Sequence, residues 1–160
     1  MFETASIDAA DKTEFYRTLA GQLEGLLEGE TDMIANAANM SALIYQMLPD
    51  LNWAGLYFLK GDQLVLGPFQ GKPACVRIPV GRGVCGAAIE RKASILVEDV
   101  HAFPGHIACD AASRSELVVP IIRGAETIGV IDLDSPLPSR FDSDDQAGIE
   151  RLARIFASSY

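Results

Sequence analysis

The stretch ELVVPIIRGAETIGVIDLD, residues 116–134, predicts a β-hairpin. Apolar and β-branched residues dominate both halves, and Gly124-Ala125 separates them, as expected for a tight turn between two antiparallel strands. We therefore predict strands at Glu116–Arg123 and Thr127–Leu133. A chain built around such a hairpin is expected to form a mainly antiparallel sheet.

Working outward from this hairpin, shorter elements are predicted upstream. A second hairpin is indicated where Gly61-Asp62 joins the apolar segments Asn52–Leu59 and Gln63–Leu66. Between the hairpins we predict a loop at Gly67–Ala74, a strand at Cys75–Ile78, a helix at Gly83–Lys92, a strand at Ser94–Val97 and a long loop at Asp99–Ser113. A loop of that length inside a compact domain is usually functional.

Helices are predicted at both ends of the chain, where apolar residues recur at helical spacing. The first begins at Asp11 and carries the stripe Phe15, Leu19, Leu23 and Leu26. The second runs from Thr31 to Met47 and carries Ile34, Ala38, Ile44 and Leu48 on its expected apolar side. The last is capped by Asp142. We expect one α+β domain over residues 1–160, with residues 1–10 as a loose arm, terminal helices on one sheet face and loops on the other.

Composition excludes several classes of protein. Apolar residues make up 49% of the chain, which argues against disorder, and the net charge of −9 argues against binding to nucleic acid. No apolar run is long enough for a membrane helix, and no secretory signal is visible, so we expect a cytoplasmic protein. In that compartment thiols stay reduced, so a disulfide would be transient and catalytic.

The segment from Cys75 to Cys109 holds all three cysteines and both histidines. Cys109 lies at the start of a possible helical turn at Ala108–Ala112, whose amides would lower the pKa of its thiol; the alternative is an ordinary buried loop cysteine. Cys75 follows a Gly/Pro loop that could bring a second thiol to the first, although an ordinary strand residue is the simpler interpretation. Cys85 is explained by helix packing. His101 and His106 with these cysteines lack the compact spacing of zinc sites.

Three carboxylates form the other candidate group. Asp132 and Asp134 are two residues apart on a strand and therefore share a face. A three-residue loop at Gly124–Glu126 would place Glu116 opposite Asp134 on that face, whereas a two-residue loop would place it on the other. Clustered carboxylates raise one another's pKa, which keeps one protonated as a general acid; solvation at a strand end is the alternative, weaker for Asp132.

Trp53 and Tyr57 are four residues apart on one strand and therefore point to the same side. They could wall an apolar pocket with polar tips, or simply belong to the core.

The chain resembles the free methionine-R-sulfoxide reductases, which are single GAF domains. The resemblance spans roughly Asp50 to Ala157. It rests on NWAGLYF from Asn52, GPFQGKPACVRIP from Gly67, GRGVCG from Gly81, DVHAFPGHIACDAASRSELVVPI from Asp99, and GVIDLDSP from Gly129.

The resemblance implies a set of roles for these residues. Cys109 corresponds to the nucleophile, Cys75 to the main resolving thiol and Cys85 to an alternative one. Glu116, Asp132 and Asp134 correspond to acid or substrate-binding groups, and Trp53 and Tyr57 to the walls of the substrate pocket. The implied reaction reduces free methionine R-sulfoxide through a sulfenic acid and a disulfide.

The same resemblance implies the partners of this reaction. No metal or organic cofactor is expected. Thioredoxin, which NADPH keeps reduced through thioredoxin reductase, is the expected reductant. A homodimer is expected because GAF domains frequently dimerise through terminal helices. Two alternatives are a GAF domain that senses a small ligand without catalysis and a scaffold module whose cysteines are core residues.

Overall fold

The computed structural model describes residues 3–107 and 109–160. They form one antiparallel sheet with helices on both faces. The six strands lie in the order β3-β2-β1-β6-β5-β4, and all neighbours pair antiparallel. Along the chain the elements are α1 (Lys12–Leu27), α2 (Met33–Met47), β1 (Trp53–Lys60), β2 (Gln63–Gly71), β3 (Arg77–Pro79), α3 (Gly83–Arg91), β4 (Ile95–Val97), the 3₁₀ helix η1 (Val100–Ala102), β5 (Ser115–Arg123), β6 (Glu126–Ser135) and α4 (Ser143–Ala157).

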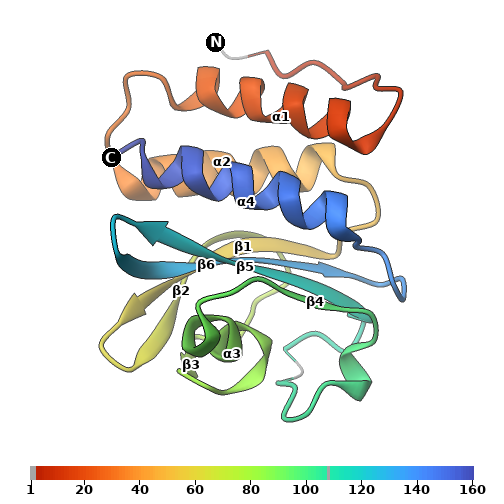
Figure 1. Cartoon of the computed structure of the whole chain (residues 1–160), viewed down its shortest axis with the longest axis vertical. Coiled ribbons are helices and arrows are strands. Elements are labelled where there is room, and N and C mark those ends of the chain that lie inside the picture. The colour runs from red at the N-terminus through yellow and green to blue at the C-terminus, as the bar shows by residue number, and fades with distance from the viewer. Residues whose placement is uncertain (1–2, 108) are drawn as a thin grey trace.

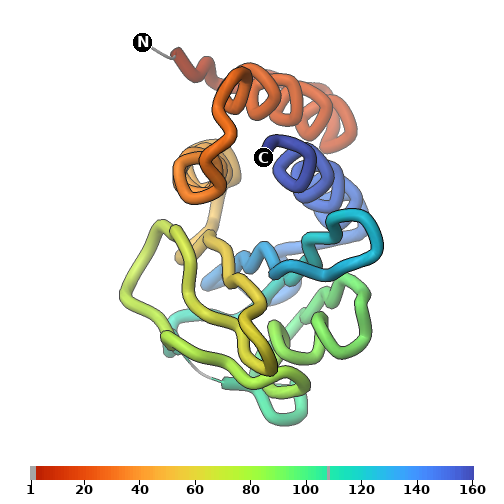
Figure 2. The backbone as a smooth tube through the Cα atoms, turned by 90° about the vertical axis from the view of Figure 1, so that its left-hand side faces the viewer, coloured from red at the N-terminus to blue at the C-terminus, as the bar shows by residue number. Residues whose placement is uncertain are grey.

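The helices are divided unequally between the two faces of the sheet. Helices α2 and α4 cover one face, and α1 packs over them as an outer layer (Figure 1). Helix α3, strand β3 and the long loops lie on the opposite side, and the view in Figure 2 shows the same separation. This confirms the expected α+β arrangement. Within the described residues, no helix combines the length and the apolar character needed to cross a membrane.

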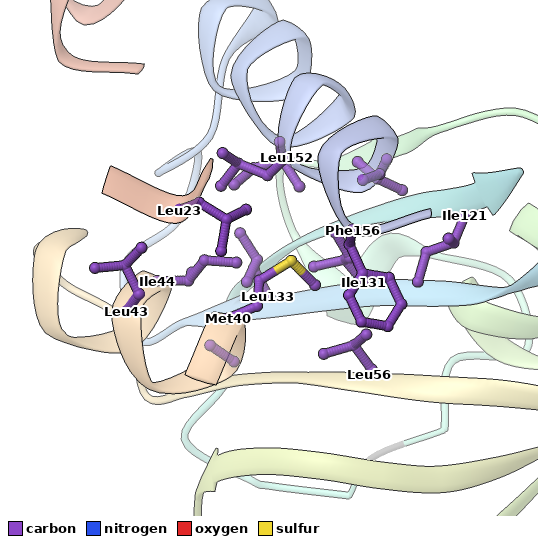
Figure 3. Packing of buried hydrophobic residues seen from close by; sticks show 14 of the residues in the cluster. Leu23, Met40, Leu43, Ile44, Leu56, Ile121, Ile131, Leu133, Leu152 and Phe156 are labelled. Carbon is purple, nitrogen blue, oxygen red and sulfur yellow. The ribbon is translucent and has the colours of Figure 1, made fainter. Parts of the chain in front are cut away.

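Alternating side chains of the central strands supply both cores. On β1, Leu56 and Phe58 face the helices, whereas Trp53 and Tyr57 face the loops. The helix-side core packs Leu56, Ile131 and Leu133 of the sheet against α2 and α4 (Figure 3). A second, smaller cluster fills the loop side. The sheet therefore separates a structural core from the side that holds every candidate site residue.

The predicted hairpins and helix caps are confirmed. Asp142 forms a capping box with Asp145 at the start of α4, and the Asp11 side chain accepts a hydrogen bond from the Glu14 amide at the start of α1. Side-chain oxygens in these positions accept hydrogen bonds from backbone amides that have no partner inside the helix. Such capping residues are recognisable in the sequence, which is why both helix starts could be predicted.

The predicted loop at Gly67–Ala74 and the predicted strand at Cys75–Ile78 are wrong in their bounds. Strand β2 continues to Gly71, because a β-bulge opposite Gly55 and Tyr57 accommodates the Gly67-Pro68 pair within the ladder. Strand β3 begins only at Arg77, so Cys75 lies in the loop that precedes it.

The predicted apolar side of α2 is also partly wrong. Ile34 is 53% exposed and Ala38 is exposed as well, whereas Met40 and Ile44 are buried. The buried side includes Asn36, whose amide donates to the Glu30 carbonyl at 3.0 Å and to Ser159 Oγ at 3.0 Å. A polar residue on the buried face hid the true register of the apolar stripe.

Helices α1 and α4 are joined at the buried carboxylate of Asp145. It accepts from Tyr16 Oη at 2.7 Å and Lys12 Nζ at 2.6 Å, and Arg140 lies 3.4 Å away. Above it the two helices approach closely, since a Cβ built on Gly148 would overlap the ring of Tyr16.

We expect Gly148→Ala to lower the free energy of unfolding by about 2–4 kcal/mol, because the added methyl group has no space against the Tyr16 ring. Gly21→Ala in α1 is the matched control: no neighbouring atom lies within 4 Å of its added Cβ, so the better helix propensity of alanine should raise stability by about 0.5–1 kcal/mol. Urea denaturation measures both. Equal effects of the two substitutions would contradict this packing.

Candidate active site

The register of the β5–β6 hairpin places the three carboxylates on one face. Arg123 pairs with Glu126, so the turn has two residues, Gly124 and Ala125. A two-residue loop alone would put Glu116 on the wrong face, but a register shift between Ile121 and Ile122 inserts an extra residue into β6. Glu116 therefore pairs with Asp134, as the three-residue alternative required.

These carboxylates are buried without a basic partner. Glu116 is 6% exposed and Asp132 is 7% exposed, and in the described part of the chain no Lys or Arg forms an ion pair with either of them or with Asp134. The nearest basic group is His106, whose Nε2 lies 3.8 Å from Glu116 Oε2. Burial lowers the pKa of His106 and so favours its neutral form.

The burial of like charges shifts the pKa of all three acids upward. Burial raises the pKa of Glu116 well above its usual range, and the charges of Asp132 and Asp134 raise it further. Burial raises the pKa of Asp132 to about 6, against opposing hydrogen bonds from Cys85 and Glu116. Burial and the charge of Asp132 likewise raise the pKa of Asp134. The cluster thus holds protons near neutral pH and can act as a general acid.

Cys85 lies beside this cluster in the first turn of α3. It is buried and hydrogen-bonded to Asp132, and burial, followed by the neighbouring carboxylate charges, raises the pKa of its thiol well above the usual value. Its environment therefore suppresses the thiolate. Packing in α3 accounts for its burial, but the contact with Asp132 was not predicted.

Cys85, Glu116 and Asp132 also form the one grouping of potential metal ligands among the residues that the structure describes, with donor atoms within 4.8 Å of one another. Neither His101 nor His106 belongs to this grouping. A cation here would have to displace the protons that the raised pKa values assign to these groups.

Cys75 and Cys109 form a disulfide with their Cα atoms 5.8 Å apart. Cys109 is exposed and Cys75 is half-buried. The helical turn predicted at Ala108–Ala112 is wrong for residues 109–112, which form a bend and a turn, and Ala108 lies outside the described residues. The helical turn of this loop is instead η1, begun by Asp99, so helix amides do not activate the Cys109 thiol.

Trp53 and Tyr57 stack on the loop side of β1, with ring centroids 5.9 Å apart. Their polar tips reach the backbone before and at Cys75: Trp53 Nε1 donates to the Lys72 carbonyl at 3.1 Å, and Tyr57 Oη donates to the Cys75 carbonyl at 3.0 Å. The predicted common face is confirmed, and both residues hold the Cys75 loop in addition to lining the pocket.

One pocket is lined by seven of the eight predicted site residues, which come from β1, the Cys109 loop, α3 and the β5–β6 hairpin: Trp53, Tyr57, Cys85, Cys109, Glu116, Asp132 and Asp134. Cys75 does not line the pocket but is bonded to Cys109, which does. The pocket wall also includes Lys72, His106, Asp110 and Ser113, which were not selected from the sequence. Single polar residues in a loop carry no periodic or motif signal, so only their contacts reveal them.

Comparisons with known proteins identify the family of the chain. Residues 39–159 match the GAF domain family. The chain is 56% identical over 142 residues to the free methionine-R-sulfoxide reductase of Escherichia coli strain K12, covering 89% of this chain and 86% of the relative.

Solved structures give the same result. The free methionine-R-sulfoxide reductase of Neisseria meningitidis, in complex with its substrate, has a TM-score of 0.94 and 41% identity, covering 99% of this chain and 95% of the other. A Burkholderia vietnamiensis protein provisionally described as a GAF sensor has a TM-score of 0.90 and 59% identity, covering 93% and 95%. By fold and sequence, the chain belongs to the GAF domain family, among the free methionine-R-sulfoxide reductases.

Proposed function

We propose that this protein reduces free methionine R-sulfoxide to methionine. The observation that carries the proposal is a proton-holding carboxylate cluster in the same pocket as Cys109. The names of relatives that share 56% and 41% identity support the substrate. Sulfoxide reduction needs these two components, a thiol to take the oxygen and an acid to protonate it.

The first chemical step uses Cys109 and one carboxylate. The Cys109 thiolate attacks the sulfoxide sulfur and forms an S–S bond to it, while a carboxylic acid of the cluster protonates the oxygen. The S–O bond and the transient S–S bond then break as the hydroxyl group passes from the substrate sulfur to Cys109 Sγ. Methionine leaves reduced, and Cys109 becomes a sulfenic acid. The shifted pKa of Glu116 suits the acid, while Asp132 and Asp134, when ionised, suit the substrate ammonium.

The second step closes the disulfide. The Cys75 thiol attacks the sulfur of the Cys109 sulfenic acid, an S–S bond forms, and the hydroxyl group leaves as water. The 5.8 Å separation of the two Cα atoms suits this bond. Thioredoxin then returns both cysteines to thiols by exchange, and NADPH regenerates it through thioredoxin reductase. The exposed Cys109 gives the external dithiol a sulfur to attack.

A ligand sensor is the second candidate, favoured by the description of the Burkholderia vietnamiensis protein. A sensor would bind a ligand in this pocket without consuming reducing equivalents. The two functions are therefore separated by turnover.

We expect Cys109→Ser to reduce turnover by about 10³-fold or more, because the hydroxyl group cannot replace the attacking thiolate. Cys75→Ser should still form about one methionine per protein molecule. Turnover should then stop with Cys109 as a sulfenic acid. NADPH consumption with thioredoxin and its reductase measures turnover, with the free R epimer, the free S epimer and a peptide-bound R-sulfoxide compared in parallel. Unchanged melting temperatures control for folding. Wild-type protein with verified free thiols that turned over none of the three would contradict the proposed function.

The unfolding free energy should fall as pH rises from 5 to 8. A carboxyl group whose pKa is raised by folding contributes fully below its unfolded pKa, near 4, and loses that contribution as pH rises through its folded pKa, about 6 for Asp132. Asp132→Asn removes this group and lowers the pKa of Glu116. We therefore expect the fall in unfolding free energy between pH 5 and pH 8 to be smaller in this variant by roughly 1–3 kcal/mol.

Urea denaturation of reduced protein across this range measures the slope. Asp62→Asn, at an exposed turn residue, is the control and should keep the wild-type slope. A wild-type protein that became more stable towards pH 8 would show that the cluster is ionised without cost.

A further inference from the structure

We propose that Asn52 is a positioning residue that holds the Cys109 loop where Cys75 can close the disulfide. The proposal rests on the proposed function for the roles of the two thiols. Asn52 immediately precedes β1 and is half-buried. Its contacts join the Cys109 loop to the carboxylate cluster.

The Asn52 side chain donates to two points of the Cys109 loop. Its Nδ2 lies 3.1 Å from Asp110 Oδ2 and 3.0 Å from Ser113 Oγ. Asp110 directly follows Cys109, and its other oxygen accepts from the Ala112 amide at 2.9 Å. The acceptor at Asp110 is charged, so this bond is of the stronger, charge-assisted kind. One amide group therefore fixes the backbone immediately after the nucleophile.

The same residue is tied to the carboxylate cluster. The Asn52 backbone amide donates to the Asp134 carbonyl at 3.0 Å. Ser113 Oγ accepts from Asn52, and Ser113 lines the same pocket as Asp134, where it lowers the pKa of that carboxyl against the larger effect of burial. Asn52 thus fixes the position of the Cys109 loop relative to β6, the strand that carries Asp132 and Asp134.

Both cysteine loops depend on side chains from β1 and the residue that precedes it. Trp53 and Tyr57 bond the carbonyls of Lys72 and Cys75 on one loop, and Asn52 bonds the other. A further contact across the loops is weak, since Lys72 Nζ lies 3.9 Å from Asp110 Oδ1 and is largely exposed. In the reduced protein the disulfide no longer joins the loops, so these side-chain bonds set the separation of the two thiols.

The orientation of the Asn52 amide supports this role. Its Oδ1 is buried without a hydrogen-bond partner, an arrangement that costs free energy. The opposite orientation would direct that oxygen at the Asp110 carboxylate, where two acceptors repel. The amide leaves one oxygen unsatisfied and keeps both donations to the loop.

The test measures disulfide closure directly. Stoichiometric hydrogen peroxide oxidises the Cys109 thiol of reduced protein to a sulfenic acid and is itself reduced to water; the Cys75 thiol then forms the S–S bond with loss of a second water. Quenching with a thiol alkylating agent and peptide mass spectrometry follow the sulfenic acid, the disulfide and the over-oxidised sulfinic acid over time. This reaction does not depend on methionine sulfoxide.

We expect Asn52→Ala and the nearly isosteric Asn52→Asp to slow closure by about 10- to 100-fold and to accumulate the Cys109 sulfenic acid, because a displaced thiol loses effective concentration. The double variant Asn52→Asp/Asp110→Asn restores a donor–acceptor pair of reversed polarity and should recover most of the rate. Asn36→Ala is the matched control, since Asn36 is another buried amide with two Nδ2 donations. It should destabilise the protein but close at the wild-type rate.

Folded Asn52 variants that closed at the wild-type rate would overturn the proposal. So would an equal slowing in Asn36→Ala, or no recovery in the double variant. A parallel single turnover with free methionine R-sulfoxide separates this proposal from the proposed function. If the Asn52 variants closed slowly with peroxide but the wild type formed no methionine, the proposed reductase activity would be contradicted. The positioning role of Asn52 would still be supported.

Discussion

The register of the β5–β6 hairpin is the constraint on which the site depends. An extra residue in β6 offsets the two-residue turn, and this single irregularity brings Glu116 opposite Asp134 and onto the face of Asp132. Burial of these acids without a Lys or Arg partner in the described chain raises their pKa values. Bound protons, in place of basic side chains, neutralise the buried carboxylates. The same burial that disfavours their ionised form therefore keeps a proton available for donation to a substrate.

Strand β1 connects this cluster to the thiols. One of its faces carries Leu56 and Phe58 into the core under α2 and α4, so the strand is held rigidly. The opposite face and the preceding residue hold both cysteine loops through Trp53, Tyr57 and Asn52. Irregular loops thereby acquire defined positions from a rigid element, as a two-thiol reaction requires.

Errors in the predictions from the sequence have a common physical origin. Gly67 and Pro68 indicate a loop when considered locally, but pairing with β1 absorbs them at a bulge. Asn36 lies on the buried face of α2, where its amide finds partners on Glu30 and Ser159. A helical turn was expected at Ala108–Ala112, yet residues 109–112 form a bend and a turn, and the side chain of Asn52 bonds this loop. In each case a distant partner overrides a local preference.

Local patterns were sufficient for the hairpins, the helix starts at Asp11 and Asp142, the antiparallel α+β class, and the shared faces of Trp53 with Tyr57 and of Asp132 with Asp134. These features depend on neighbours along the chain, whose spacing the sequence states directly. The sequence left two registers open for Glu116 and contained no signal for Asn52 or for the contact of Cys85 with Asp132. Tertiary structure decided these features, because a bulge, a buried hydrogen bond and a shifted pKa depend on which distant residues are packed together.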